Sequence, residues 1–349
     1  MKKKTLVIAL VLLLVTTVGL FAAGQAEKAE KKLKFGYAIN FMSHEFYQNI
    51  VNGAKARAEE LGIEFLVADS NNDINRQISA CENFITQGVD VLMISPVDYA
   101  AMGPIVEKAH AAGIYVVTES NSIEGDDVYV GISNGDTAEK CATWYVENVA
   151  RPNNITPVVL TVGLPALLDC RQREEGFLLG LEKSGITYKV AARIDGEGVK
   201  EKAMAKSENA LTANPDVNVI FGINDDSTTG GVAAYVASGL PVDRLTAIGF
   251  GFEGLVGQNA LLDANDPYSA AGAMFPPFIG TSLVDVGVKL VNGEAVPDYY
   301  ETPTVAINND NFATYYVKNG NAYDVNVDAV RKLLKDQPGY VREYPGFSK

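Results

Sequence analysis

One stretch of the sequence, Gly249-Phe-Gly-Phe-Glu-Gly254, has the glycine spacing of a dinucleotide-binding loop and follows an apolar run. Glycines at this spacing let a turn between a strand and a helix approach a pyrophosphate closely. Such loops normally open the first strand–helix–strand unit, and an acidic residue follows about 20 positions later. Here the loop lies late in the chain, and the corresponding residue is Met274. A nicotinamide-dependent dehydrogenase is therefore only a weak alternative, and we expect no cofactor.

A second stretch, Gly131-Ile-Ser133-Asn-Gly135, has the G-x-S-x-G spacing that presents a nucleophilic serine in many hydrolases. Those enzymes need an acid and then a histidine after the serine. The two histidines of the chain, His44 and His110, both precede Ser133. We find no other assembled catalytic machinery, so the sequence predicts a protein that is not an enzyme.

Asp324, Asn326 and Asp328 have the spacing of the first ligands of an EF-hand calcium loop. The sixth position is Ala329 instead of glycine, and the twelfth is Lys335 instead of glutamate. The calcium pattern therefore fails, and we expect no metal site.

The three cysteines, Cys81, Cys141 and Cys170, are too few and too scattered for a metal cluster or a disulfide framework. Cys81 and Cys141 fall on apolar helix positions, which favours buried thiols. One disulfide with an odd cysteine left over is the alternative in an oxidising compartment.

The N-terminal residues have the pattern of a secretory signal peptide. Three lysines at positions 2–4 precede an apolar run over 6–18, and small residues suitable for cleavage lie at 22–23. We predict a signal peptide over 1–23, a flexible tether over 24–32 and a periplasmic location. A retained N-terminal anchor is the alternative.

The chain is acidic, with 29 basic and 43 acidic side chains and a formal charge of −14. Removal of the signal segment, which has three lysines and no acid, changes this charge to −17 (−14 − 3). Such a field repels nucleic acid and anionic membranes, so we expect neither as a partner.

Strands and helices alternate along the rest of the chain, in two series. The first series has expected strands at 33–39, 63–68, 89–94, 114–118 and 128–132, with helices at 45–61, 75–87 and 99–112. The second has expected strands at 158–162, 186–192, 217–223 and 245–250, with helices at 171–184, 200–213 and 226–238. This alternation predicts an α/β fold with parallel sheets and right-handed crossovers. Because the two series resemble each other, we expect two doubly wound Rossmann-like lobes, with a ligand at the carboxyl ends of their strands.

Polar and aromatic residues gather at these predicted strand ends. The first series has Asn40, His44, Phe46, Tyr47, Ser95, Asp98, Glu119, Ser120, Asn121, Ser133 and Asn134, and the second has Arg171, Asn224, Asp225, Phe250, Glu253, Met274 and Phe275. Aromatic faces and hydrogen-bonding side chains suit a neutral polyhydroxy ligand. The alternative for each polar residue is a helix cap or a turn former.

Several segments, taken in order, resemble a known family. They are "EFYQNIVNGAKARAEELG", "ITQGVDVLMISPVD", "AHAAGIYVVTES", "CRQREEGF", "NPDVNVIFGINDD" and "AIGF". Over 33–310 the chain is similar to the periplasmic substrate-binding proteins of the ribose/galactose type, the type I fold that serves sugar ABC transporters. The resemblance implies a three-segment hinge, with one lobe over 33–133 plus 275–303 and the other over 134–274 plus 304–349. It also implies a monomer that binds a sugar or polyol and docks on an ABC transporter permease. A sensor of the same fold, signalling to a chemoreceptor or a kinase, is the alternative.

The resemblance also assigns roles to residues. Phe46 and Tyr47 would stack on the sugar ring, although the helical spacing of Phe46 also fits a core position. Asn224 would hydrogen-bond hydroxyl groups, and Phe250 would form the opposite wall. Arg171 matches the sugar-contacting arginine of the family, with Arg173 close enough to compete.

Four positions depart from the family pattern. An Asp-Arg pair is replaced by Ser120-Asn121, with Glu119 one position early, and Gly251 and Met274 replace an Asp and a Gln. Residues that could substitute are His44, Glu119, Asp225 and Glu253. The departures put ribose in doubt and leave room for another sugar, a polyol or a less hydroxylated ligand.

Overall fold

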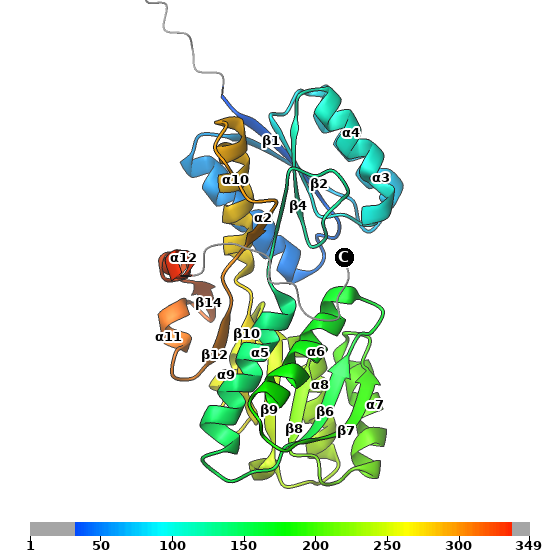
Figure 1. The fold of residues 1–349 in the computed structure, drawn as a ribbon, viewed down its shortest axis with the longest axis vertical. Coiled ribbons are helices and arrows are strands. Elements are labelled where there is room, and N and C mark those ends of the chain that lie inside the picture. Colours follow the sequence, from blue (N-terminus) through cyan, green and yellow to red (C-terminus); the bar gives the residue numbers. More distant parts are fainter. Residues whose placement is uncertain (1–31, 337–349) are drawn as a thin grey trace, which may run out of the picture. The chain divides into compact units, whose positions relative to one another are not determined.

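The computed structural model describes residues 32–336 (Figure 1). The predicted signal peptide, and all of the predicted tether except Lys32, therefore lie outside the described residues. Both large sheets belong to the second of the two units into which the chain divides, Lys34–Lys349. Within 32–336, no helix is both long enough and apolar enough to cross a membrane.

The first sheet contains six parallel strands in the order β11-β5-β4-β3-β1-β2. The strands are β1 (Lys34–Ile39), β2 (Glu64–Asp69), β3 (Val91–Ile94), β4 (Tyr115–Glu119), β5 (Val128–Gly131) and β11 (Tyr299–Glu301). Its helices are α2 (Glu45–Glu60), α3 (Ile74–Thr86), α4 (Gly103–Ala111) and α10 (Pro276–Val291). We call this sheet with its four helices the first lobe.

Helices cover both faces of the first sheet, as buried parallel strands require. Ala38, Leu92 and Val116 pack with α3 and α4 on one face, and α2 lies beside α10 on the other (Figure 1). These two helices cross closely because each has a glycine at the contact. A Cβ atom on Gly53 would lie 1.9 Å from the Pro277 carbonyl oxygen, and one on Gly280 would lie 1.9 Å from the Ile50 carbonyl oxygen.

The second sheet has the order β12-β10-β9-β8-β6-β7, and only β12 is antiparallel to its neighbour. The strands are β6 (Val158–Gly163), β7 (Lys189–Asp195), β8 (Val219–Gly222), β9 (Thr246–Gly251), β10 (Tyr268–Ala273) and β12 (Val305–Asn308). Its helices are α5 (Asn134–Tyr145), α6 (Leu168–Lys183), α7 (Lys200–Ala213), α8 (Asp225–Ala237) and α9 (Leu255–Leu262). We call this sheet with its five helices the second lobe. The predicted pair of doubly wound lobes is confirmed.

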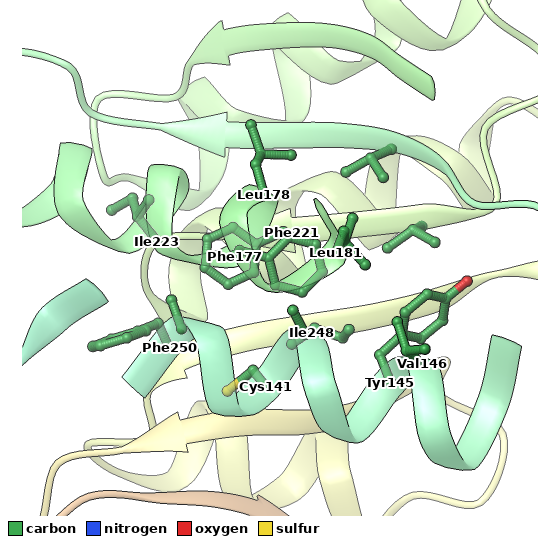
Figure 2. Packing of buried hydrophobic residues seen from close by; sticks show 14 of the residues in the cluster. Cys141, Tyr145, Val146, Phe177, Leu178, Leu181, Phe221, Ile223, Ile248 and Phe250 are labelled. Carbon is green, nitrogen blue, oxygen red and sulfur yellow. The ribbon is translucent and has the colours of Figure 1, made fainter. Parts of the chain in front are cut away.

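Neighbouring residues of the second sheet point to opposite faces and fill two separate cores. Phe221 and Ile248 pack with α5 and α6, whereas Ile220 and Ala247 pack with α7 and α8. Figure 2 shows the first of these cores, in which the rings of Phe177 and Phe221 stack 4.4 Å apart.

The chain passes between the lobes three times: after β5, after β10, and between β11 and β12. At the second passage Phe275 has a left-handed backbone, with φ of 53°.

Four C-terminal elements follow β12: α11 (Phe312–Tyr315), β13 (Tyr316–Asn319), β14 (Ala322–Val325) and α12 (Val327–Asp336). Their Phe312 and Tyr316 belong to one buried cluster with Phe252, Phe275 and Phe278.

Candidate functional site

The side chain of Glu119, the last residue of β4, is the centre of a buried hydrogen-bond network in the first lobe. Its Oε2 accepts hydrogen bonds from Ser95 Oγ at 2.6 Å and from Ser120 Oγ at 2.8 Å. Ser95 Oγ also lies 2.7 Å from the hydroxyl oxygen of Tyr37 on β1. Glu119 is only 2% exposed, and this burial raises the pKa of its carboxyl group to about 7.

Two residues after β1 complete this end of the first sheet. Asn40 is 8% exposed, and its side-chain Oδ1 has no hydrogen-bond partner in the structure. The Tyr47 hydroxyl interacts with the side chains of Asn40 and Ser120. Burial, followed by the nearby charge of Glu119, raises the pKa of Tyr47 to about 12.

Phe46 extends from the first lobe toward the second. Its ring lies 5.0 Å from that of Tyr47, measured between centroids. The side chain is half-buried and packs against the second-lobe cluster that contains Phe250 and Met274. The packing agrees with the expected core position of Phe46, and its stacking on a sugar ring stays a prediction.

Arg173 on α6 organises the facing part of the second lobe. Its Nε donates to Asn134 Oδ1 at 2.8 Å, and one terminal nitrogen donates to the Ile223 carbonyl oxygen at 3.0 Å. The guanidinium carbon lies 4.4 Å from the centre of the Phe250 ring, a cation–π contact. Another terminal nitrogen lies 3.8 Å from Met274 Sδ and 3.4 Å from Asp169 Oδ2.

The structure therefore places Arg173, and not Arg171, beside the other predicted site residues. Arg171 is exposed, and its guanidinium donates to the Pro165 carbonyl oxygen at 2.6 Å. Two residues along a helix correspond to a rotation of about 200°, so only one of the two arginines can face the sheet. The sequence signal for the correct residue is the acid at Asp169, four positions before Arg173.

Asp225, the first residue of α8, accepts two hydrogen bonds in the second lobe. The Tyr268 hydroxyl donates to its Oδ1 at 2.5 Å, and the Glu253 backbone amide donates to its Oδ2 at 3.2 Å. Burial raises the pKa of Asp225 to about 7. Burial also raises the pKa of Glu253 to about 7, and the charge of Arg173 opposes this shift.

Asn224 has its amide group engaged within the second lobe. Its Oδ1 accepts from the Ser227 amide at 2.8 Å, which caps α8, and its Nδ2 donates to the Gly198 carbonyl oxygen at 3.0 Å. A cap role accounts for this residue, and its contact with a ligand stays a prediction. Asn121 is exposed and lies outside the Glu119 network.

The two lobes contact each other where their strand-end loops meet. Asn49 Nδ2 on α2 donates to the Glu253 carbonyl oxygen at 3.2 Å. His44 Nδ1 lies 3.9 Å from Glu253 Oε2 and also caps α2 by accepting from the Phe46 amide. Burial lowers the pKa of His44, so the charge on this imidazole is disfavoured at neutral pH. Gly254 leaves space for the Glu45 carboxylate, which lies 2.3 Å from where a Cβ atom would be.

A periplasmic binding protein domain matches residues 35–295 of the chain. The chain belongs to this family. Among curated periplasmic binding proteins, it is 27% identical to the ribose import binding protein RbsB of Bacillus subtilis, over 78% of this chain and 87% of that protein. It is 28% identical to the D-xylose-binding periplasmic protein of Escherichia coli, over 83% of this chain and 91% of that protein.

Solved structures of ABC transporter solute-binding proteins share the fold. One from Mycobacterium smegmatis, with bound glycerol, has a TM-score of 0.69 and 25% identity, over 82% of this chain and 98% of that chain. One from Actinobacillus succinogenes, with bound D-allose, has a TM-score of 0.72 and 22% identity, over 81% of this chain and all of that chain. These relatives are binding proteins of transporters, and the fold class predicted from the sequence is confirmed.

The glycines of the dinucleotide-like loop have packing roles in this binding protein. A Cβ atom on Gly249 would lie 1.9 Å from the Tyr268 hydroxyl oxygen, and Gly251 has φ of 93°, which favours glycine. Tight packing and turn geometry therefore explain the spacing that resembles a cofactor loop.

Proposed function

We propose that this protein captures a monosaccharide-like ligand between its two lobes and delivers it to an ABC transporter permease. The observation that carries the proposal is the meeting of aromatic and hydrogen-bonding side chains from the strand ends of both lobes. Phe46 of the first lobe packs against the cluster that holds Phe250 of the second. The Glu119 network and the Arg173 network flank these rings with polar groups.

This arrangement suits a sugar because a sugar ring has apolar C–H faces and polar hydroxyl edges. Phe46, Tyr47 and Phe250 offer aromatic faces. Asn40 and Glu119 offer acceptors in the first lobe, and Asn134 and Arg173 offer an amide and a guanidinium in the second. Loss of the family's Asp-Arg pair argues against ribose itself.

The mechanism we propose is lobe closure. A ligand that contacts both lobes binds the closed state better than the open one, and the permease recognises the closed state. The lobes would span 33–133 plus 275–303 and 134–274 plus 304–349, with a hinge that includes Phe275. We further propose secretion by a signal peptide over 1–23, a periplasmic location and a monomeric state.

A thermal-shift screen of the mature protein against sugars, polyols and nucleosides tests the proposal. A ligand that binds only the folded state raises the melting temperature, with about 2.7 kcal/mol of added stability at 100 times its Kd. We expect one sugar or polyol class to stand out. A screen in which only nucleosides shift the melting temperature, or in which nothing does, would contradict it.

Two aromatic variants test the walls of the site. We expect Phe46→Ala and Phe250→Ala each to weaken binding of that ligand by more than twofold, because each removes a stacking face. Phe250 is buried, so circular dichroism must first show that the variant folds. Affinities within twofold of the unmodified protein in both folded variants would reject the stacking model.

A further inference from the structure

The carboxyl group of Glu119 is buried without a cation beside it. Its hydrogen-bond donors are the hydroxyl groups of Ser95 and Ser120 and the backbone amide of Ser120, and none of them carries a charge. The charged side chain that acts on it most is Asp169, another acid. Arg173, the cation in the candidate site, is engaged by Asn134, by the Ile223 carbonyl oxygen and by Asp169.

A buried carboxylate normally has a cationic partner, because desolvation without one is costly. Within residues 32–336, the structure shows no ion pair between Glu119 and a lysine, arginine or histidine. The raised pKa of Glu119 agrees with this lack of a counter-charge. The protein therefore holds an acid that a bound cation would stabilise in its ionised form.

A second, independent feature lies next to this acid. The side chain of Asn40 is buried, with 8% exposure, and its Oδ1 has no hydrogen-bond partner. The Tyr47 hydroxyl interacts with the side chains of Asn40 and Ser120, and Ser120 donates to Glu119. One contiguous set of side chains therefore joins the unpaired amide oxygen to the buried carboxyl group.

The Glu119 carboxylate, Asn40 Oδ1 and the Tyr47 oxygen act mainly as hydrogen-bond acceptors, and this restricts which ligand group can bind to them. A ligand hydroxyl has one donor hydrogen and two acceptor lone pairs, whereas a protonated amine has three donors and no acceptor. An ammonium group could donate to the Glu119 carboxylate, to Asn40 Oδ1 and to the Tyr47 oxygen together. It would also supply the missing positive charge, and hydrogen bonds between charged groups are the stronger kind.

We propose that the ligand of this protein carries a protonated amino group, as in an amino sugar or an amino polyol, bound by Glu119, Asn40 and Tyr47. The inference rests on the proposed sugar-binding function and narrows its ligand class. The hydroxyl groups of the same ligand would face Arg173 and Asn134 in the second lobe.

Titration calorimetry with matched probes tests the inference. The probes are D-glucosamine, D-galactosamine, D-mannosamine and 1-amino-1-deoxy-D-sorbitol, each beside its neutral parent, with the N-acetyl form of each amino sugar. N-acetylation keeps the ring and removes the charge. We expect at least one amine to bind about 10-fold to 100-fold more tightly than its parent, the range of a charge-assisted hydrogen bond, and its N-acetyl form to bind no better than the parent.

Variants locate the preference. Glu119→Gln should bring the affinities for the amine and its parent to within about threefold of each other, and Asn40→Ala should reduce their ratio by a smaller factor. Glu59→Gln makes the same chemical change at an exposed position of α2 and should leave the ratio unchanged. Melting curves show whether each variant folds. If Glu119→Gln does not fold, Asn40→Ala still tests the inference.

The outcomes separate the two proposals. Neutral sugars that bind as tightly as their amines would overturn the inference and leave the sugar-binding function standing. A preference for the amine that survives Glu119→Gln would overturn the assignment to this site. If neither these probes nor any sugar or polyol of the thermal-shift screen binds, both the inference and the proposed function are wrong.

Discussion

At the scale of single residues, Arg173 shows how helix phase decides which side chain reaches a site. The sequence placed two arginines within three positions on α6, and the resemblance favoured the first. Hydrogen bonds to Asn134 and to the Ile223 carbonyl oxygen require the fixed fork of a guanidinium on the inward face, where only the second lies. Glu119 and Asn40 could be predicted because they lie at the ends of strands, whereas the unpaired state of Asn40 Oδ1 depends on packing that the sequence does not show.

Replacement of each arginine by lysine tests which of the two side chains faces the site. Arg173→Lys should weaken ligand binding by about tenfold or more, because a single ammonium group cannot hold both partners of the fork. Arg171→Lys should change the affinity by less than about twofold, as expected for an exposed residue outside the network. Titration calorimetry measures both variants, and a larger loss in Arg171→Lys would contradict the structural assignment.

The buried acid Asp225 should make stability depend on pH. Its pKa is about 7 in the folded protein against 3.8 for an ordinary aspartate, so the folded state retains the proton over this range while the unfolded state loses it. Its contribution to stability is therefore full below pH 3.8 and is lost as the pH rises through 7.

Asp225→Asn removes this titration. The stability of the unmodified protein relative to the variant should fall between pH 4 and pH 8 by on the order of 4 kcal/mol. Urea unfolding at both pH values measures the difference. A difference that is constant, or that grows with pH, would show that Asp225 does not titrate as described.

At the scale of elements, alternation of apolar runs and helical spacing predicted most strands and helices of both sheets. It missed β10, β11 and β12 and the helices α5, α9 and α10. The strand β10 was missed because Tyr268–Ala273 consists largely of small residues that look like neither a strand nor a helix. Their small size has a structural reason: a Cβ atom on Gly272 would lie 2.8 Å from Thr137 and 3.0 Å from the Phe250 ring. The helix expected over 171–184 begins earlier, at Leu168, and the strand expected over 186–192 is Lys189–Asp195, since turn residues near both boundaries gave weak signals.

The crossing of α2 and α10 should tolerate no side chain at its glycines. Gly280→Ala should lower the free energy of unfolding by about 3 kcal/mol, because the added Cβ atom meets a backbone oxygen that cannot rotate away. Gly103→Ala is the matched control, because nothing lies within 4 Å of the added atom. Urea unfolding of both variants checks the prediction, which equal losses in the two would contradict.

At the scale of the whole molecule, the two lobes form from separate stretches of chain, and each has its own cores. The contacts that join the two lobes include the packing of Phe46 against the cluster of Phe250 and Met274, and a direct hydrogen bond from Asn49 to Glu253. The sequence could predict two lobes from the repeated pattern. It could not predict this contact, because Asn49 and Glu253 are 204 positions apart and lie in separate motifs whose spacing does not show that they meet.

Loss of the hydrogen bond between Asn49 and Glu253 should weaken ligand binding, although this bond does not involve the ligand. Asn49→Ala removes a hydrogen bond between the lobes and should reduce affinity by about twofold to tenfold, the range for one such bond. Asn52→Ala, at an exposed position of the same helix, should leave affinity unchanged. Calorimetry with the identified ligand measures both, and equal affinities for Asn49→Ala and the unmodified protein would show that the bond does not support closure.

The three cysteines are buried free thiols, Cys81 in the first lobe and Cys141 and Cys170 in the second. Burial raises the pKa of each thiol to about 12, so an alkylating reagent meets almost no thiolate while the packing around it stays intact. Reaction at each sulfur must therefore await a local opening of the surrounding helices. Each lobe therefore contains a buried thiol whose rate of modification reports local opening. Measured by mass spectrometry, these rates would show which lobe opens first and whether a bound solute slows the opening of both.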